Sequence, residues 1–234
     1  MESTSIHSHG PRRMGGPLAL LVTLLLVSGL ATATSAGTPK SHVGPEGVLI
    51  YNVPDLASSS TTRTGTSVDG ITCRTQAKET VKYHIHAHVA IYVHGQLRRL
   101  PAGVGITKPQ IVDHYPSGVY VDVGIYDCLY WLHTHSADGV IHVESPVKAT
   151  YTLGQFFDIW RQPLSTNQVG PAHGHVVIFE NGKKFVGNPR AVPLLAQAVI
   201  QIDVGSPVVA FHPLKFKVSG GCGEGTTSCK PAKG

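Results

Sequence analysis

Three histidines and a glutamate lie close together in residues 129–144 of the sequence, as His133, His135, His142 and Glu144. Between them, Asp138-Gly139 is typical of a two-residue hairpin turn. In that register His135 faces His142 and His133 faces Glu144. Because side chains alternate along a strand, all four then project from one face of the hairpin. Opposed Cβ atoms lie ~5 Å apart, so the four groups could reach a common ion.

A longer loop changes this pairing. If residues 136–139 form the loop, His133 faces His142 and the shared face is kept, whereas a three-residue loop reverses the faces. Crowding three imidazoles beside a carboxylate is unfavourable unless something compensates for it. Neutral imidazole and carboxylate are ordinary ligands of divalent first-row metals. The hairpin therefore predicts a transition-metal site.

A second set of histidines lies on an expected strand at residues 83–89, where His84, His86 and His88 alternate with apolar and aromatic residues. Alternation places the three imidazoles on one face, so they are further candidate metal ligands. A strand H-x-H joined by a histidine from a neighbouring strand is the ligand arrangement of zinc hydratases such as carbonic anhydrase, a likeness of geometry alone. The alternative for any single H-x-H is a polar pair that faces solvent.

The sequence also contains an internal echo. Residues 86–95 match residues 173–182, with five of ten positions identical, and each copy ends in a turn pair, His94-Gly95 or Asn181-Gly182. This predicts two similar hairpins and a duplication, although two unrelated hairpins could obey the same turn rules. The second copy supplies a third H-x-H, His173 and His175, which are less certain metal ligands because they fit a decayed copy equally well.

The composition indicates a β-rich fold. The chain has 26 Gly and 16 Pro, and only 14% of its residues are charged. We therefore predict a mainly β domain (β-rich α+β), an antiparallel sheet or sandwich of hairpins with one short helix. Thr152 and Gln155 form a capping box that should begin this helix, and Pro163 should end it. Other expected strands are residues 48–53, 119–123, 129–135, 140–144, 198–204 and 211–218.

The chain divides into four parts. In residues 1–36, Arg12 and Arg13 precede an apolar run and then small residues, the order of a secretory signal peptide. An uncleaved membrane anchor is the alternative, and it would be the chain's one membrane contact. Residues 37–72 are rich in Ser, Thr, Gly and Pro and predict a flexible linker. Residues 73–218 should be the metal-binding domain, and residues 219–234 a Gly- and Lys-rich tail.

The four cysteines, Cys73, Cys128, Cys222 and Cys229, all follow the predicted signal. In an exported protein an even number of cysteines favours disulfides. Cys222 and Cys229 would then close a small loop in the tail, and Cys73 would pair with Cys128 across the domain. A cysteine metal site is the alternative, but no pair has C-x-x-C spacing.

The charge and the methionine content restrict which ligands and partners the protein could bind. The net charge is +5, but the basic residues are scattered in ones and twos, so we expect no nucleic-acid partner. The predicted partner is a divalent transition metal, zinc or copper, with iron held by two histidines and a carboxylate as a further option. The only methionines are Met1 and Met14, so the mature part cannot hold copper(I) through methionine. No protein partner is indicated.

Residues 73–160 resemble a group of uncharacterised secreted bacterial and archaeal proteins. The resemblance covers the histidine-rich strand at 84–88, the segment Pro101-Ala-Gly-Val-Gly105, the H-T-H and G-x-I-H-x-E hairpin at 133–144, and T-L-G-Q-F-F at 152–157. It implies a common fold and a common site. We know of no established activity for the group, so the resemblance implies no reaction.

Three functions are consistent with these residues. The first is an exported metal-binding protein that acts in metal capture, delivery or tolerance. The second is a secreted metalloenzyme (hydrolase, lyase or oxygenase) with an open metal position, where Asp138, Glu144 or a nearby histidine serves as acid or base. The third is an adhesion module whose histidines sense pH. The sequence contains no nucleophile elbow, phosphate loop, H-E-x-x-H helix or dinucleotide fingerprint.

Overall fold

The structure, a computed structural model, describes Gly10 and residues 39–75, 80–108, 110–124 and 127–218. The described residues from Pro39 onward belong to one compact unit. The predicted signal segment, apart from Gly10, and the tail with Cys222 and Cys229 lie outside the described residues. Among the residues described, no helix is long and apolar enough to cross a membrane.

Strands dominate the fold. They are β1 (Ser41–Val43), β2 (Leu49–Tyr51), β3 (Cys73–Thr75), β4 (Tyr83–Val93), β5 (Gln96–Arg98), β6 (Gln110–Tyr115), β7 (Gly118–Val123), β8 (Cys128–Tyr130), β9 (Leu132–His133), β10 (Val140–Ser145), β11 (Tyr151–Thr152), β12 (Gln168–Val169), β13 (Ala172–His173), β14 (Val176–Glu180), β15 (Lys183–Lys184), β16 (Pro193–Leu194) and β17 (Val199–Val204). The helical segments are η1 (Ser59–Thr61), α1 (Leu153–Trp160) and η3 (Pro189–Ala191). The predicted mainly β fold with one short α-helix is confirmed.

The main sheet has seven strands in the order β15-β14-β17-β4-β10-β9, with β5 paired to β4. Its strand pairs are antiparallel except for β17, which runs parallel to β4. The sequence predicted only antiparallel pairing. The 11-residue strand β4 lies in the middle of this sheet, between β17 and β10.

One face of β4 builds the apolar core. Ile85, Ala87, Val89 and Ile91 alternate along the strand and are buried with the side chains of α1. That helix begins at the predicted capping box: Thr152 N donates to Gln155 Oε1 (2.9 Å), and Gln155 N donates to Thr152 Oγ1 (3.4 Å). It presents apolar and aromatic side chains to the sheet, including Phe156, Phe157, Ile159 and Trp160. Arg161, in the left-handed conformation at φ +59°, ends it two residues before Pro163.

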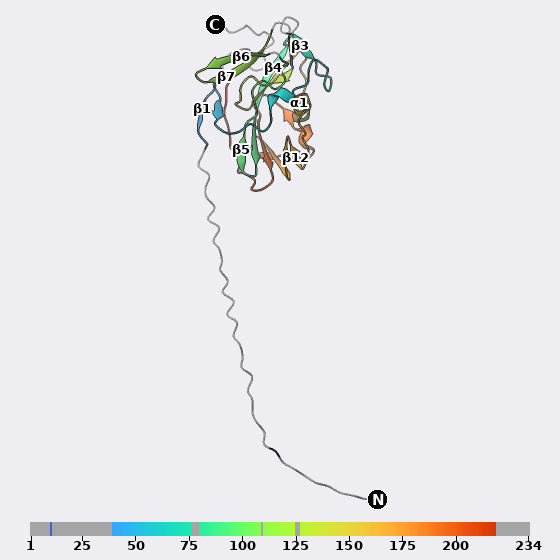
Figure 1. The fold of residues 1–234 in the computed structure, drawn as a ribbon. Coiled ribbons are helices and arrows are strands. Elements are labelled where there is room, and N and C mark those ends of the chain that lie inside the picture. Colours follow the sequence, from blue (N-terminus) through green and yellow to red (C-terminus); the bar gives the residue numbers. More distant parts are fainter. Residues whose placement is uncertain (1–9, 11–38, 76–79, 109, 125–126, 219–234) are drawn as a thin grey trace, which may run out of the picture. The chain divides into compact units, whose positions relative to one another are not determined.

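The other face of β4 carries histidines and is covered by two hairpins. Figure 1 shows β1, β6 and β7 to the left of β4 and α1 to its right. The β1–β2 hairpin packs on the β6–β7 hairpin, since an added Cβ at Gly118 would lie 3.2 Å from Ile50 Cδ1 and 3.5 Å from Pro45 Cδ. The sheet thus separates an apolar layer from a polar one.

The segment that the sequence predicted as a linker, residues 37–72, differs from that prediction over its described part. Leu56, Val68 and Ile71 are buried in the main core, and Trp160 Nε1 donates to Ser58 O (2.9 Å). These apolar side chains are spaced widely among Ser, Thr and Gly, so the composition hides them. These parts of residues 39–72 are therefore packed into the domain.

The strand predicted at residues 211–218 is not present. Two buried polar side chains of β17 hold the chain there instead: Val209 N donates to Asp203 Oδ1 (2.8 Å), and His212 N donates to Gln201 Oε1 (3.0 Å). These side-chain bonds hold the start of the segment, and no neighbouring strand pairs with it.

The disulfide predicted between Cys73 and Cys128 is confirmed. It links β3 to β8, which pair in an antiparallel register. Because β8 ends only two residues before β9, the bridge fastens the strand that leads into the histidine hairpin.

Both echoed hairpins are also confirmed. His94 and Gly95 have φ of +49° and +74°, and Asn181 and Gly182 have φ of +50° and +82°. Two successive positive φ values are the signature of a type I′ turn, which joins β4 to β5 and β14 to β15. The two copies lie in one sheet, separated by β17. Their origin by duplication stays a prediction.

Candidate metal centre

The histidine hairpin has the longer of the two predicted loops. His133 pairs with His142 and Leu132 with Val143, so the two-residue turn at Asp138-Gly139 is wrong and the register with the 136–139 loop is right. Gly139, at φ +87°, accepts a hydrogen bond from Val89 N (2.8 Å), which docks the loop on β4. The hairpin loop thus contacts a third strand, β4, and the sequence of the hairpin alone gives no sign of this contact.

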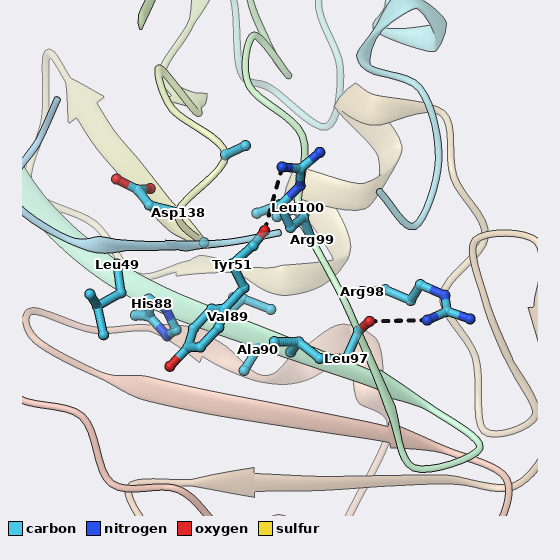
Figure 2. Close-up of a pocket in the computed structure, with 12 residues that line it drawn as sticks. Leu49, Tyr51, His88, Val89, Ala90, Leu97, Arg98, Arg99, Leu100 and Asp138 are labelled. Carbon is cyan, nitrogen blue, oxygen red and sulfur yellow. Dashed lines mark hydrogen bonds between the residues drawn. The ribbon is translucent and has the colours of Figure 1, made fainter. Parts of the chain in front are cut away.

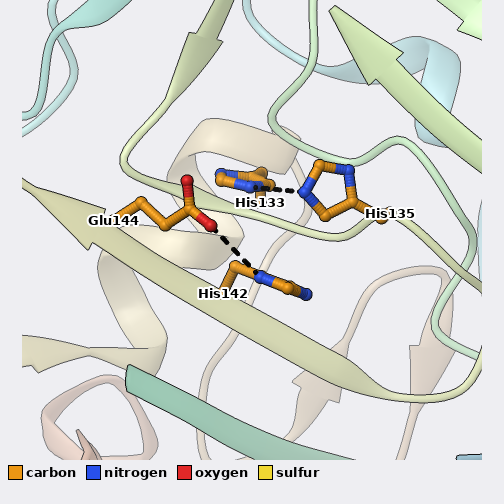
Figure 3. Close-up of side chains that lie close together, drawn as sticks. All are labelled: His133, His135, His142 and Glu144. Carbon is orange, nitrogen blue, oxygen red and sulfur yellow. Dashed lines mark hydrogen bonds and ion pairs between the residues drawn. The ribbon is translucent and has the colours of Figure 1, made fainter. Parts of the chain in front are cut away.

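The four predicted hairpin residues come together. His133, His135, His142 and Glu144 each offer one ligand atom, and these atoms all lie within 4.8 Å of one another. Figure 3 shows the three rings and the carboxylate gathered at one point. We call this set the hairpin cluster. His133 Nε2 and His135 Nε2 are 3.1 Å apart, and His142 Nδ1 is 3.4 Å from Glu144 Oε1.

The backbone fixes the orientation of two of these rings. His133 Nδ1 lies 2.8 Å from Tyr130 O, and His135 Nδ1 lies 2.7 Å from Val121 O. A carbonyl oxygen can only accept, so each Nδ1 carries the hydrogen of the neutral ring. The Nε2 lone pairs of His133 and His135 are therefore left facing each other. This is the tautomer that a metal ligand needs.

The third ring is oriented by a carboxylate that the sequence did not predict. Glu46 is only 2% exposed, and its Oε1 lies 2.7 Å from His142 Nε2. Its Oε2 accepts a hydrogen bond from Ser136 N (3.2 Å). With Nε2 engaged, His142 presents Nδ1 to Glu144. Glu46 lies 96 residues from His142 in the predicted linker, and no local spacing pointed to it.

Burial and charge set the protonation of the cluster. Burial, followed by the nearby His135, lowers the pKa of His133 to about 3, and burial also lowers the pKa of His135. Burial opposes charge on His142 as well, but Glu46 and Glu144 outweigh it and raise the pKa of His142 to about 10.

The two carboxylates are ionised despite their burial. Burial alone would raise the pKa of Glu46, but His142 outweighs it and lowers that pKa to about 2. Hydrogen bonds from His142 and His84 likewise hold the pKa of Glu144 well below its usual range, against the effect of burial. The hairpin cluster and Glu46 thus carry two negative charges and one positive charge. This balance favours a bound cation.

The β4 histidines lie directly opposite the hairpin. In the β4–β10 pair, His84 faces Glu144 and His86 faces His142. His84, His86 and His142 form a second group whose ligand atoms lie within 4.8 Å of one another, and we call it the strand cluster. His84 Nε2 is 3.1 Å from Glu144 Oε1, which joins the two clusters.

The remaining predicted ligands lie outside both clusters. His88 is buried, but its ring lies against Phe216, with 5.8 Å between ring centroids. His173 and His175 are exposed, and His173 pairs with Gln168 in the β12–β13 hairpin.

The comparisons with known proteins assign this chain to no family. Comparisons with protein families, with curated proteins and with solved structures find no match. The resemblance to a group of secreted proteins therefore stays a prediction. What the site can do has to be argued from its own geometry.

The hairpin cluster is covered from outside the main sheet. Tyr120 of β7 stacks on His135, with 4.5 Å between ring centroids and 8° between planes. Ser136 Oγ donates to Val119 O (3.3 Å), so β7 contacts the hairpin loop at several points. Together with Glu46 of the β1–β2 hairpin, these contacts seal the cluster from two sides.

A pocket lies beside the centre and does not open on it. Figure 2 shows His88 and Asp138 among its lining residues, which also come from β2 and β5 and include none of the hairpin cluster. Asp138 Oδ1 accepts a hydrogen bond from Val140 N (3.0 Å), and burial, followed by Glu46, raises the pKa of Asp138 to about 7. Asp138, predicted as a candidate acid or base, is thus not among the grouped ligands.

The donor set fits a metal ion. The hairpin cluster offers three imidazole nitrogens and a carboxylate oxygen, all of which are zinc ligands, and zinc commonly takes four ligands. Each ring is held through its other nitrogen by a backbone carbonyl or a carboxylate, as is usual for metal-binding histidines. The buried His and Glu groups of this protein could therefore hold a metal ion.

Proposed function

We propose that the protein is an exported transition-metal-binding protein, and that His133, His135, His142 and Glu144 hold one zinc or copper(II) ion. The observation that carries the proposal is the fixed orientation of the three imidazoles. Tyr130 O, Val121 O and Glu46 each engage the distal nitrogen of one ring. The Nε2 lone pairs of His133 and His135 face each other in a buried space, which is unfavourable without a cation to accept them.

The burial of the ligands supports binding over catalysis. All three histidines are buried, and Glu144 as the fourth ligand would close the coordination sphere. A catalytic ion needs an open position, whereas a closed site suits capture, delivery or tolerance of the metal. Copper(II) binds imidazole-rich sites more tightly than zinc, so supply would decide which ion is held.

Export is part of the proposal. The disulfide between Cys73 and Cys128 suits an oxidising compartment, where such bonds persist. The N-terminal order of basic, apolar and small residues is that of a secretory signal. A protein outside the cytoplasm would meet metal ions before they reach the cell interior.

The decisive experiment is elemental analysis of the natively exported protein. We expect zinc or copper to co-purify, and the double variant His133→Ala/His135→Ala to lose it. The matched control is His173→Ala/His175→Ala, which removes an H-x-H from the surface and should keep the metal. Retention of metal by the hairpin variant would disprove this site. A wild-type protein without metal, even after incubation with zinc or copper(II), would leave the pH-sensing interaction module as the better reading.

A second candidate function, a metalloenzyme, is favoured by one observation. The Glu144 side chain is 16% exposed, more than the His84 and His142 side chains it contacts, and its Oε1 already lies 3.1 Å from His84 Nε2. If Glu144 stays bonded to His84, the ion keeps three histidines and an open fourth position. Azide added to the cobalt-substituted protein distinguishes the two: its absorption bands shift at an open position and stay unchanged at a closed one.

A further inference from the structure

His84 and His86 are not needed to hold a single ion. The hairpin cluster already supplies the four ligands that a tetrahedral zinc site takes. Yet both β4 histidines are buried, on the same face and directly opposite Glu144 and His142. The four ligands of the first ion include neither of them, although both offer ligand atoms to the strand cluster.

We infer that His84 and His86, together with Glu144, form a second metal position, so that each chain binds two ions. The inference rests on the proposed function, because the second ion lies against the first. Its ligand class is the same: a divalent transition metal held by imidazole and carboxylate.

The geometry around His86 supports a second position. The ring of His86 lies 4.5 Å from that of His84 and 4.5 Å from that of His142, centroid to centroid. These three residues have ligand atoms within 4.8 Å of one another. An ion placed beside His84 and His86 would adjoin the hairpin cluster, as neighbouring ions do in two-metal sites, where they lie about 3.5–4 Å apart.

The two clusters share His142, and Glu144 resolves the competition. One imidazole nitrogen binds one ion, and Glu46 already holds His142 Nε2. His142 Nδ1 is therefore left for the first ion only. Glu144 Oε1 lies 3.1 Å from His84 Nε2 and 3.4 Å from His142 Nδ1, so this carboxylate contacts one histidine of each cluster. A carboxylate in that place can bridge two ions.

The charges indicate where solvent enters. Glu46 and Glu144 offset two of the four positive charges of two divalent ions. The remaining two positive charges need an anion such as hydroxide, and the Glu144 side chain is 16% exposed, against 3% for His84. Bound anions would thus contact the second ion first.

The first test counts ions. The natively exported protein is dialysed against excess zinc, and bound zinc per chain is measured by mass spectrometry. We expect two ions in the wild type, two in the control His173→Ala/His175→Ala and one in His84→Ala/His86→Ala. One ion in the wild type would overturn the second position and leave the proposed function intact. None would overturn the proposed function itself.

The second test needs no variant, so it is independent of folding defects. The wild type is loaded with one and then two equivalents of copper(II), and its electron paramagnetic resonance spectrum is recorded. Two ions that share Glu144 couple magnetically, so the second equivalent should remove signal from the first and add a half-field transition. Two additive, uncoupled signals would show that the second ion lies elsewhere, and the inference would fail.

Discussion

The two H-x-H motifs of the echoed hairpins have opposite fates. His86 and His88 are buried on β4, whereas His173 and His175 are exposed just before β14. The segments share a pattern, a type I′ turn and a sheet, so the motif itself does not explain the difference. Beside β4 lies β10, which brings His142 and Glu144 into register. Of the buried pair, only His86 joins a cluster, and it does so because the neighbouring strand supplies His142.

One residue within the motif also separates the copies. Ala87 continues β4, but its counterpart Gly174 has φ +150°, a conformation that strongly favours glycine. A Cβ on Gly174 would lie 2.8 Å from Gly205 N. The backbone therefore turns away from the sheet at this point, and His173 pairs in a small separate hairpin.

The largest expected effect comes from removing His142, which contacts both Glu46 and Glu144. His142→Ala leaves Glu46 and Glu144 buried without their shared cation, so we expect a loss of about 3–5 kcal/mol in metal-free stability. The control His175→Ala, at an exposed histidine, should change stability by no more than about 0.5 kcal/mol. Urea unfolding of both variants, with a chelator present, measures the difference. Equal losses would mean that the contacts of His142 with Glu46 and Glu144 do not stabilise the fold.

The second prediction concerns Glu46, the carboxylate that orients His142 on the strand beside β4. Glu46→Ala frees His142 Nε2 and lets the ring turn, so the affinity for zinc should fall about 10- to 100-fold. Glu46→Gln keeps an acceptor at Oε1 and should lose less. Competition with a chromogenic chelator gives both affinities. If Glu46→Ala binds zinc as tightly as the wild type, Glu46 does not position His142.

The third prediction tests the glycine that separates the copies. Gly174→Ala forces a side chain into a strained conformation and against Gly205, so we expect a stability loss of at least about 1 kcal/mol. Metal content should stay unchanged, since His173 and His175 lie outside both clusters. Thermal unfolding and elemental analysis of the same sample check both halves. Loss of metal in this variant would contradict the separation of the two copies.

The smallest expected effect is a pH dependence of stability that comes from Asp138, in the loop of the histidine hairpin. The pKa of Asp138 is raised to about 7, mainly by burial, so the folded protein holds this proton more tightly than the unfolded chain. The stability that it contributes is complete at low pH and is lost as pH rises through 7. The metal-free wild type should therefore lose more stability between pH 5 and 8 than Asp138→Asn does.

The matched control for this prediction is Asp113→Asn, at an exposed aspartate of β6. It should leave the difference between pH 5 and pH 8 as it is in the wild type. If Asp138→Asn behaves like this control in chemical unfolding at both pH values, Asp138 does not hold the proton.

Strand periodicity predicted much of the site and little of its surroundings. Alternation alone placed His133, His142 and Glu144 on one face, and that survived the wrong turn because both registers keep the same parity. The true register depended on Gly139 docking against Val89, a contact between distant segments. Glu46 could not be found from spacing, because its partner lies 96 residues away.

Sequence pattern also failed where side chains replace backbone pairing. The alternation at residues 211–218 reads as a strand, but Gln201 and Asp203 hold the start of that segment through side-chain hydrogen bonds. Similarly, the Ser- and Thr-rich composition before Cys73 concealed Leu56, Val68 and Ile71, which are core residues. Composition averages over a window, whereas burial is decided residue by residue.

Because side chains alternate along β4, its two faces can change independently of each other. Its odd-numbered residues from Ile85 to Ile91 pack in the apolar core with the helix, and on its other face His84 and His86 join the strand cluster. Mutations can therefore exchange one donor atom for another, and so retune the preferred element, without disturbing the scaffold beneath. Related proteins with this strand could therefore change the metal they prefer while keeping the same fold.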